Sequence, residues 1–274
     1  MKKLNYRLIA SDFDGTLVDD KQQISEKVGA AISDYVRCGG IFCVCTGRML
    51  RSILPQARNL GLKGLVVAYQ GTIIADIESG KIIKSGGMEY ADVALICRTL
   101  EELNQPINVY CGDTLYTNIP KDNPYLQTYE RIVCVEAEYA GDKMSEFVTE
   151  NKLYCQKVAV LVSADKQEEL YKKLSELLGN KFDVTCSATV LIEISPISDN
   201  KGEAVKYLAN YYGIPIEKTI AMGDNLNDLP MVKIAGLGVA VANATEKLKQ
   251  AADFISVSNN DGAVAQIIEK FGFI

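Results

Sequence analysis

The chain has 274 residues, of which 48% are hydrophobic and 23% charged, and its formal net charge is −6. At about 100 to 200 residues per domain, this length excludes a single small domain and is sufficient to bury a large core. The acidic balance and the scattered basic residues argue against sequence-independent nucleic-acid binding, which needs a basic face. No apolar run approaches the ~18 residues of a membrane span, so we expect a soluble, cytoplasmic protein without nucleic-acid or membrane partners.

The sequence contains eight cysteines and no histidine. Cys43 and Cys45 lie inside an apolar run, Cys97 lies in a helical pattern, and Cys111 and Cys186 lie at strand ends. No Cys-x-x-Cys pair occurs, so we expect reduced, buried thiols. The absence of histidine excludes Ser-His-Asp and Cys-His nucleophile systems and histidine-based zinc sites. Any chemistry must therefore use carboxylates, hydroxyls, lysine and arginine.

Apolar strand-like runs alternate with amphipathic helical patterns in the first 85 residues. Such alternation is typical of a doubly wound, mainly parallel sheet in an α/β fold. The expected elements are, in chain order, a strand at 7–13, a helix between the cap residue Ser25 and Gly39, a strand at 41–45, a helix at 49–60, a strand at 65–69 and a hairpin at 73–84.

The same alternation returns after about residue 196. The expected elements there are a helix at 201–212, a strand at 219–222, a helix at 227–234, a strand at 237–241, a helix at 246–252, a strand at 253–257 and a final helix from Gly262.

The middle of the chain follows a different pattern. Residues 92–118 and 166–194 each indicate helix, strand, turn, strand, which is either a weak internal repeat or a chance similarity of two amphipathic helices. We expect residues 1–85 and 196–274 to form one α/β domain, and residues 86–195 to form an inserted α+β domain.

The sharpest motif is Asp12-Phe13-Asp14-Gly15-Thr16, directly after the first buried strand. Ligands of open α/β sheets bind beyond the carboxyl ends of strands, and residues two apart on a strand project to the same side. Asp12 and Asp14 are therefore expected to converge. Two close carboxylates repel each other unless a cation lies between them, and Mg2+ prefers such oxygens. The alternative is an Asp-Gly turn without a catalytic role.

Three further motifs follow or begin predicted elements. Thr46-Gly47-Arg48 ends the second strand and can form an anion site, or simply cap a helix. Lys201-Gly202 opens a helix, and Lys201 is either a surface lysine or a group that neutralises a phosphoryl group. Residues 223–228, Gly-Asp-Asn-Leu-Asn-Asp, follow a strand and suit a hydrated cation, or form an Asx-rich turn.

These four motifs, in this order, resemble those of the haloacid dehalogenase superfamily of phosphatases, specifically its Cof-like, class IIB branch. The run from Gly238 to Ala244 also matches, whereas Gln70-Gly71-Thr72 stands where relatives usually have Asn-Gly-Ala. The resemblance implies a Rossmann-like core and a cap, residues 86–195, that determines substrate specificity.

The resemblance also implies the roles of individual residues. Asp12 is the nucleophile that forms an aspartyl-phosphate, and Asp14 is the general acid and base. Mg2+ is held by Asp12, the Asp14 carbonyl and Asp224, with Asp228 acting through water. The expected phosphate ligands are Phe13, through its backbone N–H, Thr46, Gly47, Lys201 and Asn227, and the candidate substrate contacts in the core are Arg48 and Gln70.

The resemblance predicts a Mg2+-dependent phosphatase for small phosphorylated metabolites. Such relatives act on sugar phosphates, flavin mononucleotide or pyridoxal phosphate. Phosphomutases and phosphotransferases share the same core motifs, and a phosphoacceptor signalling domain uses a similar set of side chains. A non-catalytic phospho-ligand-binding relative is the fourth alternative.

Overall fold

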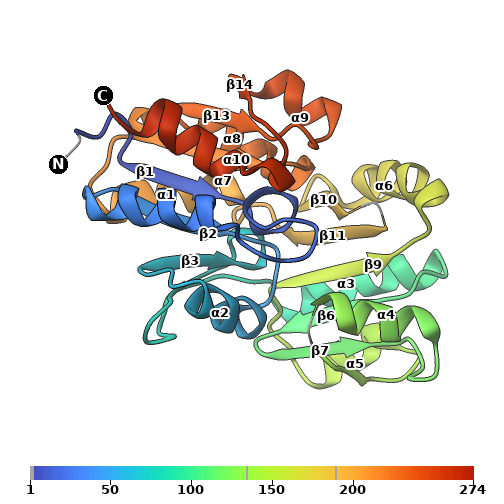
Figure 1. Ribbon diagram of the computed structural model, residues 1–274. Helices are drawn as coiled ribbons and strands as arrows, with labels where there is room; N and C mark the ends of the chain where they lie inside the picture. The colour runs from blue at the N-terminus through green and yellow to red at the C-terminus, as the bar shows by residue number, and fades with distance from the viewer. Residues whose placement is uncertain (1–2, 134, 189) are drawn as a thin grey trace. The chain divides into compact units, whose positions relative to one another are not determined.

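The computed structural model of the chain describes residues 3–133, 135–188 and 190–274 (Figure 1). These residues form two compact units. The first contains the described residues up to 47 together with 54–84 and 200–274, and the second contains residues 48–53 and 85–199.

The first unit is built on an eight-stranded sheet with the order β14-β13-β12-β1-β2-β3-β4-β5. Its pairs from β14 to β3 are parallel, and β4 pairs antiparallel with β3. The strands are β1 (Leu8–Ser11), β2 (Ile41–Cys45), β3 (Leu65–Ala68), β4 (Ile73–Asp76), β5 (Ile82–Ser85), β12 (Thr219–Gly223), β13 (Leu237–Ala240) and β14 (Phe254–Ile255).

Helices cover this parallel sheet because its strands are apolar on both faces. Leu8, Ala10 and Cys43 share a buried cluster with Val205 of α7 and Met231 of α8. The helices are α1 (Glu26–Arg37), α7 (Lys201–Tyr211), α8 (Leu229–Ile234), α9 (Glu246–Ala251) and α10 (Ala263–Ile267), together with the part of α2 (Leu50–Asn59) from residue 54 onward. None of the helices in the described part of the chain has the length and hydropathy needed to cross a bilayer.

The second unit is an α+β structure on a six-stranded, mostly antiparallel sheet with the order β10-β11-β9-β6-β7-β8. The strands are β6 (Asn108–Cys111), β7 (Thr114–Thr117), β8 (Ala137–Tyr139), β9 (Lys157–Leu161), β10 (Phe182–Ala188) and β11 (Leu191–Pro196). The helices are α3 (Tyr90–Glu102), α4 (Pro124–Val133), α5 (Met144–Glu150) and α6 (Ala164–Leu178).

The predicted fold class, a doubly wound sheet with an inserted α+β unit, is confirmed. Two details differ from the sequence-based expectation. β1 ends at Ser11, because residues 13–17 form a tight turn in which Gly15 has φ +70°. The helix expected at 227–234 is a short 3-10 turn, Leu226–Asp228, followed by α8.

The expectation that all cysteines are reduced is wrong for one pair. Cys111 and Cys155 form a disulfide, whereas Cys43, Cys45 and Cys97 are free and buried, as is Cys186. Antiparallel pairing of Tyr110 with Lys157 brings the two bonded residues together although 44 positions separate them in the chain. The spacing of the cysteines in the sequence does not reveal this register between the two strands. Cys134 lies outside the described residues.

Candidate active site

Three parallel strands of the first unit end side by side. β1 lies between β12 and β2. Asp12 follows β1, Thr46 follows β2, and Asp224 follows β12. Because these strands run in the same direction, the three residues lie at one edge of the sheet, which is the edge where open α/β sheets bind ligands.

An acidic cluster forms at this edge. Asp12, Asp224 and Asp228 each offer a carboxylate oxygen, and these oxygens lie within 4.8 Å of one another. Asp14 does not join this cluster through its carboxylate, although its charge reaches Asp12. The strand alternation that predicted convergence of Asp12 and Asp14 does not extend that far, since β1 ends at Ser11.

Lys201 holds two members of the cluster. It is the first residue of α7, whose N-cap Asn200 accepts a hydrogen bond from the backbone N–H of Glu203. Its side chain is fully buried, and its Nζ lies 2.6 Å from Asp12 Oδ1 and 2.6 Å from Asp228 Oδ1. The helix start thus places one cation between two carboxylates, and the surface alternative for this lysine is excluded.

Both carboxylate oxygens of Asp228 accept hydrogen bonds. While Oδ1 accepts from Lys201, Oδ2 accepts from the backbone N–H groups of Asp224 (2.9 Å) and Asn225 (3.0 Å). Gly223 is required beside it, because a Cβ there would lie 2.3 Å from the Asp228 Cβ. Asp228 therefore fixes the loop that carries Asp224.

The turn after Asp12 also positions Asp224. Thr16 donates from Oγ1 to Asp224 Oδ1 at 3.0 Å, and Asn243 donates from Nδ2 to the Gly15 carbonyl at 2.8 Å. A Cβ at Gly15 would lie 2.9 Å from Asp224 Oδ2, in a backbone conformation that glycine favours. Both Thr16 and Asn243 lie within sequence motifs, but the motifs do not predict that these two side chains position Asp224.

A left-handed segment follows β3. Tyr69, Gln70 and Gly71 all have positive φ angles, and the Gln70 backbone N–H donates to the Thr46 carbonyl at 3.0 Å. The Gln70 side chain is buried, and its Oε1 accepts from Asn227 Nδ2 at 3.1 Å. Strained backbone of this kind is concentrated at functional sites, where the surrounding structure holds it.

The remaining predicted residues are distributed as follows. Phe13 is buried in the turn after Asp12, and Gly47 follows Thr46. The contacts of Arg48 group it with the second unit, so Arg48 is not part of the cluster described in the first unit.

The cluster carries excess negative charge. Burial raises the pKa of Asp12 well above its usual value; Lys201 opposes this shift, and the neighbouring carboxylates reinforce it. Burial, followed by the charge of Asp228, raises the pKa of Asp224 to about 7. Burial alone would lower the pKa of Lys201, but Asp12 and Asp228 outweigh it and raise that pKa. One protonated lysine therefore faces three carboxyl groups.

This donor set fits a hard divalent cation. The cluster offers carboxylate oxygens from Asp12, Asp224 and Asp228, which are ligands that Mg2+ prefers. Asp12 uses one oxygen for Lys201, and Asp224 uses one for Thr16. Because both oxygens of Asp228 already accept hydrogen bonds, Asp12 and Asp224 are the residues of this cluster that can coordinate a metal ion directly.

The raised pKa of Asp224 makes stability depend on pH when no metal is bound. The folded chain binds this proton with a pKa of about 7, compared with an ordinary value of 3.8. The resulting stabilisation is complete below about pH 4 and is lost as the pH rises through about 7. We therefore expect the melting temperature in EDTA to contain a component that falls as the pH rises from about 4 to about 7. The matched control is Asp224→Asn, and a wild-type profile identical to that of the control would contradict the prediction.

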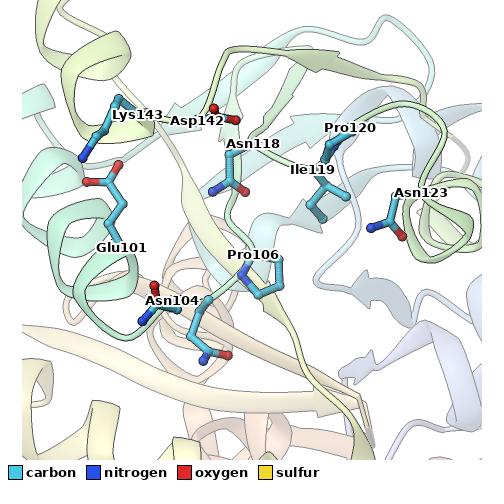
Figure 2. A pocket seen from close by; sticks show the side chains of 10 residues that line it. Glu101, Asn104, Pro106, Asn118, Ile119, Pro120, Asn123, Asp142 and Lys143 are labelled. Carbon is cyan, nitrogen blue, oxygen red and sulfur yellow. The ribbon is translucent and has the colours of Figure 1, made fainter.

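A surface pocket of about 410 Å³ lies elsewhere, in the second unit, as Figure 2 shows. Two of its polar side chains accept hydrogen bonds from neighbouring residues. Glu101 accepts hydrogen bonds from the backbone N–H and the hydroxyl of Ser145, and Asn118 accepts from the backbone N–H of Ile107. None of the sequence-predicted site residues lines this pocket, so it is not the candidate active site.

Residues 9–268 match the haloacid dehalogenase-like hydrolase family. The chain belongs to this family. Phosphatase YwpJ of Bacillus subtilis is 31% identical over 288 residues, covering 96% of this chain and 99% of its own. The 5-amino-6-(5-phospho-D-ribitylamino)uracil phosphatase YwtE of the same bacterium is 29% identical over 283 residues, covering 96% and 97%.

A solved structure of a haloacid dehalogenase-like hydrolase from B. subtilis is also similar. It matches with a TM-score of 0.85 at 27% identity, covering 96% of this chain and 99% of that one. This member of the haloacid dehalogenase-like family is therefore a phosphatase of the Cof-like type, as its motifs predicted.

Proposed function

We propose that this phosphatase hydrolyses small phosphorylated metabolites in a Mg2+-dependent reaction, through an aspartyl-phosphate on Asp12. The observation that carries the proposal is the buried Lys201 ammonium, which contacts Asp12 and Asp228 while Asp224 lies beside them. This arrangement combines a nucleophilic carboxylate, a fixed cation and oxygen donors for a metal, and it requires no histidine.

In the first half-reaction, a carboxylate oxygen of Asp12 attacks phosphorus. A bond from phosphorus to Asp12 forms, the ester bond breaks, and Asp14 gives its proton to the leaving oxygen. Lys201, with Thr46, Gly47, Asn227 and the Phe13 backbone N–H, binds the phosphoryl oxygens. Asp12, Asp224 and the Asp14 carbonyl would hold Mg2+, which would supply charge compensation for the phosphate dianion.

In the second half-reaction, Asp14 acts as a general base. It takes a proton from water as the water oxygen attacks phosphorus, which releases inorganic phosphate and restores Asp12. Asp228 acts as a positioning residue, because it orients Lys201 and the loop of Asp224.

The proposed substrates are phosphate esters of sugars or sugar alcohols. The relative YwtE is named for a substrate with a phosphorylated ribityl chain, and it matches nearly the full length of this chain. We further propose that residues 86–195 act as a cap that selects among such esters, since the predicted catalytic residues lie outside this range.

The proposal is tested by phosphate release from a panel of phosphorylated metabolites. We expect turnover with Mg2+, loss of activity in excess EDTA and recovery when Mg2+ is restored. Sugar and sugar-alcohol phosphates should be hydrolysed better than nucleoside monophosphates. Activity that persists unchanged in excess chelator would refute the metal-dependent scheme.

A further inference from the structure

Two loops of the first unit, which follow β13 and β14, are hydrogen-bonded to the turn after β1. β13 pairs in parallel with β12 and with β14, so these loops leave the sheet at the same edge as the acidic cluster. The backbone N–H of Val241 donates to the Gly223 carbonyl at 3.1 Å, and that of Thr245 donates to the Asp224 carbonyl at 2.9 Å. The loop after β13 therefore supports the candidate active site as well as connecting two elements.

The turn after β1 has a defined backbone geometry. Asp14 has φ −78° and ψ 131°, and Gly15 has φ 70° and ψ 0°. These values are typical of the two central residues of a type II turn. The backbone N–H of Val18 donates to the Phe13 carbonyl at 3.1 Å and closes the turn. The position of Asp14 therefore depends on the peptide groups that follow it, up to Val18.

Two asparagines connect this turn to the two loops. Asn243 donates from Nδ2 to the Gly15 carbonyl at 2.8 Å and accepts at Oδ1 from the Asn259 backbone N–H at 3.0 Å. Asn259 donates from Nδ2 to the buried Val18 carbonyl at 3.1 Å. Asn243 and Asn259, which we call the asparagine brace, thus hold the turn at Gly15 and at Val18 and are hydrogen-bonded to each other.

The hydrogen bonds of the brace require amide groups. Asn259 Nδ2 also donates to Asp20 Oδ1 at 3.2 Å, so it faces two acceptors. Hydrogen bonds from Asn260 and then from Asn259 lower the pKa of Asp20, so this carboxylate stays ionised at neutral pH. A rotated Asn259 amide would place its oxygen against these acceptors, which fixes its orientation. At Asn243, the two contacts require a side chain that offers both a donor and an acceptor.

We propose that Asn243 and Asn259 are positioning residues that hold Asp14 in place for its proton transfers. This inference rests on the proposed function, in which Asp14 protonates the leaving oxygen. A small displacement of a general acid lowers the rate strongly, because proton transfer requires hydrogen-bond distance to the reacting oxygen. Both asparagines act through the backbone of residues 15–18, so neither has to contact the substrate.

Asn243→Asp separates this role from a purely structural one. The aspartate retains the acceptor for the Asn259 backbone N–H, so the two loops should stay connected, but it cannot donate to the Gly15 carbonyl. We expect kcat for D-glucose 6-phosphate to fall about tenfold relative to kcat for p-nitrophenyl phosphate, whose leaving group needs little protonation. The added charge acts on the phosphate group of both esters, so its effect cancels in this ratio.

The Michaelis constants provide a second readout. At saturating Mg2+, KM for both esters should change less than about twofold in Asn243→Asp, because the phosphate-binding groups are unaltered. Asn243→Ala should lower the kcat ratio as Asn243→Asp does, since both variants lack the donor. An unchanged kcat ratio in Asn243→Asp would overturn the proposal.

Asn259→Ala and Asn260→Ala form a matched pair. Both substitutions remove a hydrogen bond to the Asp20 carboxylate, and Asn259→Ala also removes the hydrogen bond to the Val18 carbonyl. We expect Asn259→Ala to lower the kcat ratio about tenfold and Asn260→Ala to leave it unchanged. Equal ratios in the two variants would reject the role of the brace.

Amide hydrogen exchange separates this inference from the proposed function. The Val18 N–H is hydrogen-bonded within the turn, so release of the turn should speed deuterium uptake in residues 13–18. Uptake should increase in Asn243→Asp and Asn259→Ala and stay at the wild-type level in Asn260→Ala. If the wild type hydrolyses no ester, the proposed function fails, and deuterium uptake still decides whether the brace holds the turn.

Two results of the exchange experiment would overturn the inference. One is unchanged uptake in Asn243→Asp and Asn259→Ala, which would show that the brace does not hold the turn. The other is faster uptake together with an equal loss of kcat on both esters, which would indicate a purely structural role.

Discussion

Asp12→Asn should lower kcat at least about 1,000-fold on every phosphate ester, because the neutral amide is a poor nucleophile towards phosphorus. The fold should be retained. An amide oxygen can still accept the hydrogen bond that Lys201 donates at 2.6 Å. The substitution also removes a carboxylate whose pKa burial raises, so the loss of one charge relieves repulsion with Asp224 and Asp228. Phosphate release and the melting temperature are measured together.

Asp14→Asn distinguishes the nucleophile from the general acid. With a good leaving group such as p-nitrophenolate, attack needs little protonation, so this variant should retain more activity on the aryl ester than on a sugar phosphate. Acid quenching should then reveal protein that carries one covalent phosphoryl group, since the second half-reaction also needs Asp14. Near-normal turnover by Asp12→Asn, or a covalent phosphoryl group on another residue, would reject Asp12 as the nucleophile.

Lys201→Met should affect both stability and catalysis. The lysine is fully buried between Asp12 and Asp228, so its removal leaves two carboxylates without their cation. Breaking a buried pair of this kind costs about 3 to 5 kcal/mol. The activity should fall at least about 100-fold as well, because the phosphoryl oxygens lose a fixed positive charge. Urea denaturation and phosphate release measure the two effects.

The matched control is Lys206→Met in the same helix. Lys206 is about half exposed and pairs with Glu203 at the surface, so its loss should cost less than about 1 kcal/mol. The loss of stability caused by Lys201→Met should also become smaller as the pH falls and the neighbouring carboxylates become protonated. Equal destabilisation by the two substitutions would show that Lys201 does not compensate the buried charges.

The sequence by itself determined the fold class and the edge of the sheet that carries the chemistry. Alternating apolar strands and helices specify a parallel sheet, because only strands covered on both faces are apolar throughout. Motifs placed directly after strands then share one edge by geometry. For this reason the sequence alone predicts that Asp12, Thr46 and Asp224 lie at the same edge of the sheet.

Only the tertiary structure decided how the side chains are paired. The Lys201 contacts with Asp12 and Asp228 span 189 and 27 positions, and the hydrogen bond from Thr16 to Asp224 spans 208. Local secondary-structure propensity contains no information on contacts between residues that are so far apart in the sequence. The carboxylate cluster in the structure consists of Asp12, Asp224 and Asp228, and β1 ends at Ser11, so strand alternation does not determine how Asp12 and Asp14 are oriented.

The same distinction holds in the second unit. A period of two predicts strands, but the register decides which residues of different strands become neighbours. The pairing of Asn108, Ala159 and Glu193 and the disulfide between Cys111 and Cys155 both follow from the register of β6 against β9 and its neighbours. The register is determined by the packing of whole strands against helices. The packing energy is distributed over many contacts, and no single sequence motif contains them all.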